Sequence, residues 1–169
     1  CKQFGDLRSS LVKEAATCVE ALSAELGDAL EPIVDALVEA VMTMLGTTNK
    51  VLQCEGNRAM ACILAGHRVS RSIAKRCYLG LASKVPTQRQ YSIDYLGRII
   101  RASRRYTAAF FERNLDEIEK VVKKALTDGV PSIRDLARSV FWDFYAVWEK
   151  RGAKILASLD PNTKKNLLK

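Results

Sequence analysis

A helical stripe of apolar residues that recurs along the chain constrains its fold more than any other feature. In residues 128–148, apolar side chains fall 3, 4, 7, 8, 11, 12 and 15 positions after Ile133, which is the spacing of one face of an α-helix. We place the same register at Leu11, Val51 and Gln88, so the four starts lie 40, 37 and 45 residues apart. This repetition predicts a chain built from similar helical units.

A second helix is expected after each of the first three stripes, over residues 30–45, 69–81 and 110–126. Glycines at positions 27, 46 and 66 punctuate the expected helix ends. Asp160 and Pro161 form an N-cap and a first-turn proline, which predict a last short helix over 162–168. No alternating run of β-branched residues indicates a strand. The spacing is close to the roughly 40–47 residues of HEAT and armadillo units, so we predict an all-α fold, an α-solenoid of HEAT-like antiparallel helix pairs.

We expect one domain over residues 1–169, because no internal linker interrupts the pattern. The expected repeats cover about 6–45, 47–81, 83–126 and 128–158, followed by the short C-terminal helix at 160–168. The first four residues look like the end of an earlier element, so we also expect most of a preceding repeat to be absent from this sequence.

Charge and cysteine content narrow the function. The net charge is +8, which favours an acidic partner, and the apolar runs are too short to cross a membrane. The five cysteines include no CxxC pair, and His67 is the only histidine, so we expect small buried thiols in a reducing compartment and no metal or cofactor. No nucleophile and base stand in a recognisable motif, so we expect a protein that is not an enzyme.

A basic residue stands at or near the start of each expected first helix, within residues 5–8, 48–51, 84–89 and 128–134. A cation there opposes the helix dipole, at a cost of a few tenths of a kcal/mol. Four such positions on one edge of a helical stack predict a basic binding surface for an acidic partner. For any single residue, an ordinary solvated side chain is the alternative, and Arg138 could instead pair with Asp135 or Asp143.

Several segments resemble a TOG domain of the CLASP family. DLRSSLVKEA at 6–15 is similar to its second HEAT repeat, NKVLQCEG at 49–56 to the third, SKVPTQRQ at 83–90 to the fourth and DGVPSIRDLARSVFW at 128–142 to the fifth. The last fifteen residues, ILASLDPNTKKNLLK, resemble the short C-terminal repeat. TOG domains bind tubulin through the loops along one edge of the stack. The resemblance therefore implies a tubulin- or microtubule-binding module in the cytoplasm, at microtubules and the spindle, monomeric within a longer chain.

The resemblance also nominates contact residues. The stronger candidates are Lys50, Val51, Lys84, Arg89 and Arg134, and the weaker ones are Asp6, Leu7, Arg8, Asn49 and Arg138. The family's first repeat usually presents an apolar loop residue, which lies before the start of this sequence. We expect Trp142 and Trp148 to fall on the buried stripe, where they cannot replace it.

Two other functions stay open at this stage. A generic HEAT scaffold would bind peptides or proteins in its concave groove. A nucleic-acid-binding HEAT protein would use the basic middle of the chain, but stacking aromatic residues are scarce there and no nucleic-acid motif occurs. That basic middle comprises Arg68, Arg71, Lys75, Arg76, Arg98, Arg101, Arg104 and Arg105.

Overall fold

The computed structural model describes residues 9–66, 71–102 and 108–168, and all regular structure in these ranges is helical. The elements are α1 (Ser9–Leu26), the 3-10 helix η2 (Gly27–Leu30), α2 (Glu31–Leu45), α3 (Lys50–Gly66), α4 (Arg71–Leu81), α5 (Pro86–Arg101), α6 (Ala108–Leu126), α7 (Pro131–Val147), α8 (Glu149–Ser158) and α9 (Pro161–Leu167). The predicted all-α class is confirmed. None of the described helices is long and apolar enough to cross a membrane.

The chain folds into two compact units, Cys1–Arg76 (unit 1) and Cys77–Lys169 (unit 2). The boundary falls inside α4. The extent of a single domain over 1–169 therefore stays a prediction, and each unit is described by itself.

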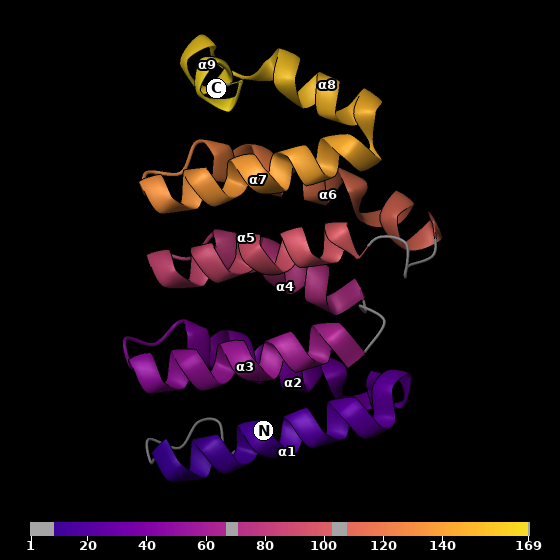
Figure 1. Ribbon diagram of the computed structural model, residues 1–169, viewed down its shortest axis with the longest axis vertical. Coiled ribbons are helices and arrows are strands. Elements are labelled where there is room, and N and C mark those ends of the chain that lie inside the picture. Colours follow the sequence, from indigo (N-terminus) through magenta and orange to yellow (C-terminus); the bar gives the residue numbers. More distant parts are fainter. Residues whose placement is uncertain (1–8, 67–70, 103–107, 169) are drawn as a thin grey trace. The chain divides into compact units, whose positions relative to one another are not determined.

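In unit 1, α1 and α3 lie side by side and α2 packs against α3 (Figure 1). Gly66 permits the close approach, because a Cβ atom there would stand 2.5 Å from the carbonyl oxygen of Ser23 on α1. The core between these helices is aliphatic and includes Val12 and Met60, both 0% exposed. Arg58 on α3 donates a hydrogen bond of 3.1 Å to Thr17 on α1. Packing and a polar contact thus hold the same pair of helices together.

In unit 2, α5 and α7 form the equivalent side-by-side pair, with α6 against α7 (Figure 1). A Cβ atom at Gly97 on α5 would lie 2.7 Å from Val140 Cγ2 on α7, so the absent side chain allows the helices to meet. Phe141 and Phe144 are fully buried in this core. Arg151 attaches α8 to α6, with 2.6 Å contacts to Asp116 and Glu119.

The repeat register predicted from the sequence is right in unit 2 and wrong by one residue in unit 1. Ile133 on α7 is buried as predicted. In α3, however, Val51 is 40% exposed, and Leu52 is the buried residue of the first turn. In α1, Val12 rather than Leu11 is fully buried. Each predicted start in unit 1 fell on the first of two consecutive apolar residues, and periodicity alone cannot choose between them.

Three further predictions about apolar residues need correction. Trp142 is 41% exposed rather than buried, because it follows Phe141 by one position and so points about 100° away from the core face. Trp148 is only half-buried, as the residue between α7 and α8. The cysteines, expected to be buried, are so only in part, because Cys77 is buried whereas Cys18 and Cys54 are exposed. The last helix forms as predicted, with the Asp160 carboxylate accepting hydrogen bonds from two backbone amides of α9.

Candidate binding loops

The same hydrogen bond closes the loop before α3, α5 and α7. In each case the fourth residue of the helix donates a side-chain hydrogen bond to the carbonyl oxygen six residues earlier. The donors are Gln53 to Thr47 at 2.5 Å, Arg89 to Ser83 at 3.0 Å and Arg134 to Asp128 at 2.7 Å. We call this contact the loop clamp. It satisfies a loop carbonyl and fixes how the chain enters the helix.

In unit 1, the loop before α3 is built from neutral groups. Asn49 caps the helix, because its Oδ1 accepts hydrogen bonds from the backbone amides of Val51 at 2.9 Å and Leu52 at 3.4 Å. Thr47 Oγ1 donates to the Met44 carbonyl at 2.8 Å, which fastens the other end of the loop. Lys50, the first helical residue, is exposed, and the part of the chain that the structure describes offers it no partner.

In unit 2, Arg89 joins two loops. Its Nε and Nη2 donate to the two carboxylate oxygens of Asp128 at 2.8 and 3.1 Å, a bidentate pair. Its Nη1 donates to the Ser83 carbonyl and also to the Lys84 carbonyl at 3.2 Å. The two side chains of the ion pair are only 16% and 10% exposed. Arg89 therefore holds the loop before α5 to the loop before α7.

The charge of Asp128 is stabilised by this arrangement. The hydrogen bond from Arg89 lowers the pKa of the Asp128 carboxyl, against the opposing effect of its burial. Asp128 also accepts a hydrogen bond of 2.9 Å from the backbone amide of Val130, the extended residue before the first-turn Pro131. Ser83 does the same for Val85 before α5, at 3.1 Å. Short polar side chains thus shape both turns.

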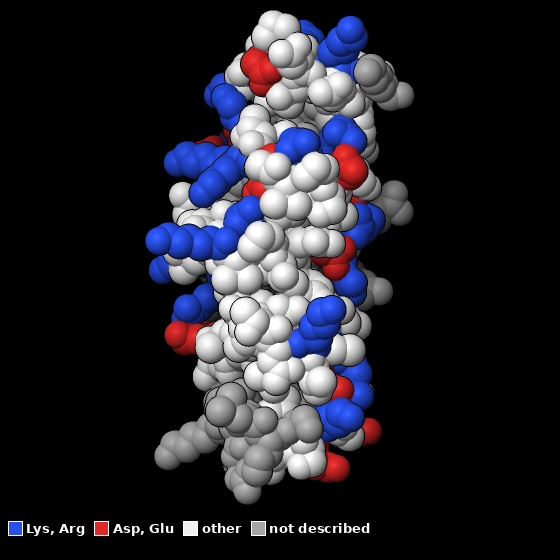
Figure 2. All heavy atoms as spheres, turned by 90° about the vertical axis from the view of Figure 1, so that its left-hand side faces the viewer, with Lys and Arg blue, Asp and Glu red and all other residues white. Residues whose placement is uncertain are grey.

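The remaining predicted site residues differ in how available they are. Lys84 is exposed, and the described residues hold no partner for its ammonium group. Arg134 is half-buried, with one Nη in the loop clamp. Arg138, one turn further along α7, pairs with Asp135, one of the two partners considered from the sequence. Figure 2 shows Lys and Arg side chains gathered along one side of unit 2, in the upper half of the view.

The structure therefore divides the nominated residues. Lys50, Val51 and Lys84 are presented to solvent, and Arg89 is held inside the loops. Asp6, Leu7 and Arg8 lie outside the described residues. Sequence reasoning missed Gln53, which closes the loop before α3, and Asp128, which pairs with Arg89. The signal for Gln53 is its position, because Gln53, Arg89 and Arg134 each stand fourth in their helix once the helix starts are known.

Several cations of the basic middle of the chain have carboxylate partners. Within unit 1, Arg76 pairs with Glu39 at 2.8 Å. Within unit 2, Arg98 pairs with Asp94 at 2.9 Å and Arg101 with Asp143 at 2.6 Å. Arg68, Arg104 and Arg105 lie outside the described residues, as does the side chain of Arg71. No cluster of three or more metal-ligating side chains occurs in the described ranges.

Comparison with solved structures identifies the fold. One comes from work on tubulin recruitment and assembly by microtubule polymerases with TOG domain arrays. It matches with a TM-score of 0.78 at 17% identity, over 96% of this chain and 34% of that one. A second, from work on microtubule plus-end tracking by XMAP215, CLIP-170 and EB1, has a TM-score of 0.77 at 17% identity and covers 96% and 68% of the two chains. The fold is that of the TOG domains, a HEAT-like helical solenoid.

The family follows from the sequence match. The family model described as CLASP N terminal matches residues 1–168, so the chain belongs to this family. Among curated relatives, Protein stu-1 of Neurospora crassa is 25% identical over 169 residues, which is 99% of this chain and 15% of that protein. Protein STU1 of Mycosarcoma maydis is 28% identical over 168 residues, or 98% and 13% of the two chains. The chain thus spans about a seventh of the length of these relatives.

Proposed function

We propose that this chain is a tubulin- or microtubule-binding module of a CLASP-like regulator of microtubule dynamics. It binds its partner through the loop that precedes the first helix of each repeat. The activity is association without a catalytic step. Its place in the cell is then the cytoplasm, on microtubules and the spindle. The role of any longer protein that contains this chain is part of the same proposal, because the relatives are far longer than the matched region.

The loops themselves carry the proposal. Each is fixed by a loop clamp, yet the cations that stand outside the clamp position, Lys50 and Lys84, stay exposed without a partner among the described residues. Side chains on a rigid loop lose less freedom on binding than those on a flexible one. Together with the net charge of +8, this favours an acidic protein surface as the partner.

The candidate residues take different roles in this scheme. Lys50 and Lys84 contact acidic groups of the partner, and Val51, 40% exposed beside Lys50, supplies an apolar contact. Arg89 positions the loops and does not face the partner, because it already donates four hydrogen bonds. Arg134 both closes its loop and offers the rest of its guanidinium for binding.

The weaker candidates are ranked in the same way. Asn49 acts through the helix cap, and Arg138 contributes less than Arg134 because Asp135 already pairs with it. Asp6, Leu7 and Arg8 stay nominated by the family resemblance alone.

The test compares partners directly. The chain is mixed with tubulin dimers, with microtubules, and with duplex and single-stranded nucleic acid at the same near-physiological salt concentration. We expect measurable binding to tubulin or microtubules and weaker binding to nucleic acid, since a phosphate-driven interaction falls steeply with salt. Tighter binding to nucleic acid at that salt would overturn the proposal. Tubulin binding that survives loss of Lys50, Lys84 and Arg134 together would instead favour the concave helix faces.

A further inference from the structure

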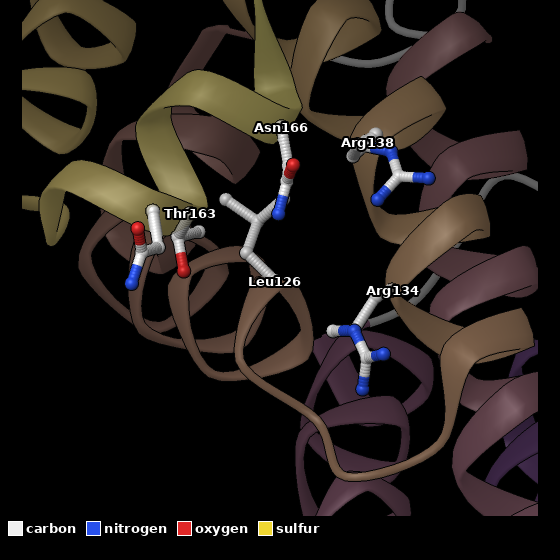
Figure 3. A pocket seen from close by; sticks show the side chains of 6 residues that line it. Leu126, Arg134, Arg138, Thr163 and Asn166 are labelled. Carbon is white, nitrogen blue, oxygen red and sulfur yellow. The ribbon is translucent and has the colours of Figure 1, made fainter.

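A small polar pocket lies in unit 2 where the end of α6, the start of α7 and the last helix α9 meet. Its volume is about 100 Å³, and it is lined by Leu126, Arg134, Arg138, Asn162, Thr163 and Asn166. Figure 3 shows the two arginines of α7 on one side of the pocket and Thr163 and Asn166 of α9 on the other. This volume admits one small chemical group and is well below the roughly 300 Å³ of pockets for drug-sized ligands.

The lining of the pocket has the chemistry of an anion site. Two guanidinium groups supply positive charge, and two amides and a hydroxyl supply neutral hydrogen-bond donors. No carboxylate lines the pocket. Only one Nη of Arg134 is used, in the loop clamp, so most of its planar fork has no partner among the described residues. A guanidinium in this state suits bidentate binding of a carboxylate or phosphate.

The nearby carboxylates already have partners on the protein. Asp128 holds Arg89, and the exposed Asp135 pairs with Arg138 from outside the pocket lining. Asp160 caps α9, accepting from the backbone amides of Asn162 at 3.1 Å and Thr163 at 3.0 Å. The two arginines stand four residues apart on one helix, where like charges repel. Asp135 offsets part of the charge of Arg138, and an anion between the two arginines would offset more of the repulsion.

We propose that this pocket receives one carboxylate side chain of an acidic protein partner. Arg134 and Arg138 bind the carboxylate, and Asn162, Thr163 and Asn166 complete its hydrogen bonds. The identity of the partner rests on the proposed function, but the pocket's preference for an anion does not. The consequence is that α9 is part of the binding surface, and not only a cap on the repeat.

The first experiment tests the pocket without tubulin. The isolated chain is titrated with acetate and, separately, with inorganic phosphate, and NMR records the Nε–H signals of its arginines. We expect both anions to shift the signals of Arg134 and Arg138, with those of Arg98 unmoved, and the shifts to weaken in Asn166→Leu. No selective shift with either anion would overturn the pocket. Phosphate binding more than tenfold tighter than acetate would overturn the carboxylate assignment in favour of a phosphorylated group.

The second experiment measures the affinity for tubulin of Arg138→Gln, Asn166→Leu and a charge-matched control, Lys165→Gln. Lys165 is an exposed residue of α9 that does not line the pocket. We expect a loss of threefold or more for each pocket variant and less than twofold for the control. Equal losses in Arg138→Gln and Lys165→Gln would show general electrostatics and contradict the proposal. Selective anion shifts in a chain that does not bind tubulin would refute the proposed function and leave the anion site standing.

Discussion

The two units close the loops before their helices with the same hydrogen bond but with different side chains. In unit 1, Gln53 closes the loop before α3 with a neutral amide, and the contact stays within that loop. In unit 2, Arg89 occupies the equivalent position, and its ion pair with Asp128 joins two loops. A basic residue near a helix start is therefore not by itself a sign of binding. Arg89, whose guanidinium is fully engaged within the loops, is not available to a partner, whereas Lys50 and Lys84 are exposed and Arg134 has only one Nη in its clamp.

The difference has an energetic consequence. Removing the amide of Gln53 deletes a single hydrogen bond, whereas removing Arg89 leaves the 10% exposed Asp128 side chain without its cation. A buried charge that loses its partner costs more than the pair contributed. We therefore expect the loops of unit 2 to be sensitive to single substitutions and the loop of unit 1 to be tolerant.

The largest effects should come from the cores beneath these loops. Met60 on α3 and Phe141 on α7 each lie ten residues into their helix, and both are 0% exposed. Phe141→Ala should lower the free energy of unfolding by about 3–5 kcal/mol and Met60→Ala by about 2–5 kcal/mol. Urea unfolding followed by circular dichroism measures both. A loss below about 1 kcal/mol for either variant would mean that the replaced side chain is not buried, and would contradict the orientation of its helix in the structure.

Next in size is the clamp of unit 2. Arg89→Ala should cost about 2–4 kcal/mol, somewhat less than the range for a fully buried pair, and Gln53→Ala only about 0.5–1.5 kcal/mol. Arg98→Ala, which breaks an exposed pair with Asp94 on the same helix, serves as the control at about 0.5 kcal/mol or less. Equal costs for Arg89→Ala and Gln53→Ala would remove the distinction between the two loops.

The effect of Arg134→Ala on stability should fall between those of Arg89→Ala and Arg98→Ala. A surface cation would change stability by less than about 0.5 kcal/mol, but Arg134 donates a 2.7 Å hydrogen bond to the Asp128 carbonyl. We expect Arg134→Ala to cost about 0.5–1.5 kcal/mol of stability. Arg134→Lys should retain part of that stability and lose affinity for the partner, because an ammonium group cannot bind a carboxylate bidentately. A thermal melt run beside each binding measurement separates the two effects.

The smallest effect depends on pH and is read at a single backbone amide. The folded-state pKa of Asp128 lies below its ordinary value of 3.8, so its contribution to stability is present above that value and is lost as pH falls through the lowered pKa. Amide exchange of Val130, which donates to Asp128, should then speed up below about pH 4, beyond the intrinsic trend. The amide of Val51 donates to the non-titrating Asn49 and is the control. Identical behaviour of the two amides, or a response that persists in Asp128→Asn, would contradict this.

Much of the fold could be predicted from the sequence, because the apolar stripes are long and regular. The stripe of α7 correctly predicted that Ile133, Phe141 and Phe144 face the core. The register errors fall where periodicity is ambiguous. Val51 and Leu52 are adjacent apolar residues, and the Asn49 cap, which fixes where α3 begins, is a local feature that periodicity does not contain. Trp142 is a different kind of error, because it lies nine positions after Ile133 and so outside the stripe, and the spacing itself indicates its exposed position.

The candidate site was only partly predictable. Lys50 and Lys84 could be nominated from their positions near helix starts, since exposure there needs no long-range information. The role of Arg89 could not, because its partner Asp128 is 39 residues away and the pairing exists only after folding. The same holds for Asn162, Thr163 and Asn166, which meet Arg134 only when α9 packs near α7.

The central claim is that the exposed lysines of the loops contact the partner, whereas Arg89 only positions the loops. The most direct measurement is the affinity for tubulin of Lys50→Gln/Lys84→Gln against Lys13→Gln/Lys154→Gln, a control that removes the same charge from exposed helix positions, one in each unit. We predict about a tenfold loss, or 1.4 kcal/mol, for the loop pair, less than twofold for the control, and an unchanged melting temperature for both. Equal affinities of the two double variants would contradict the claim.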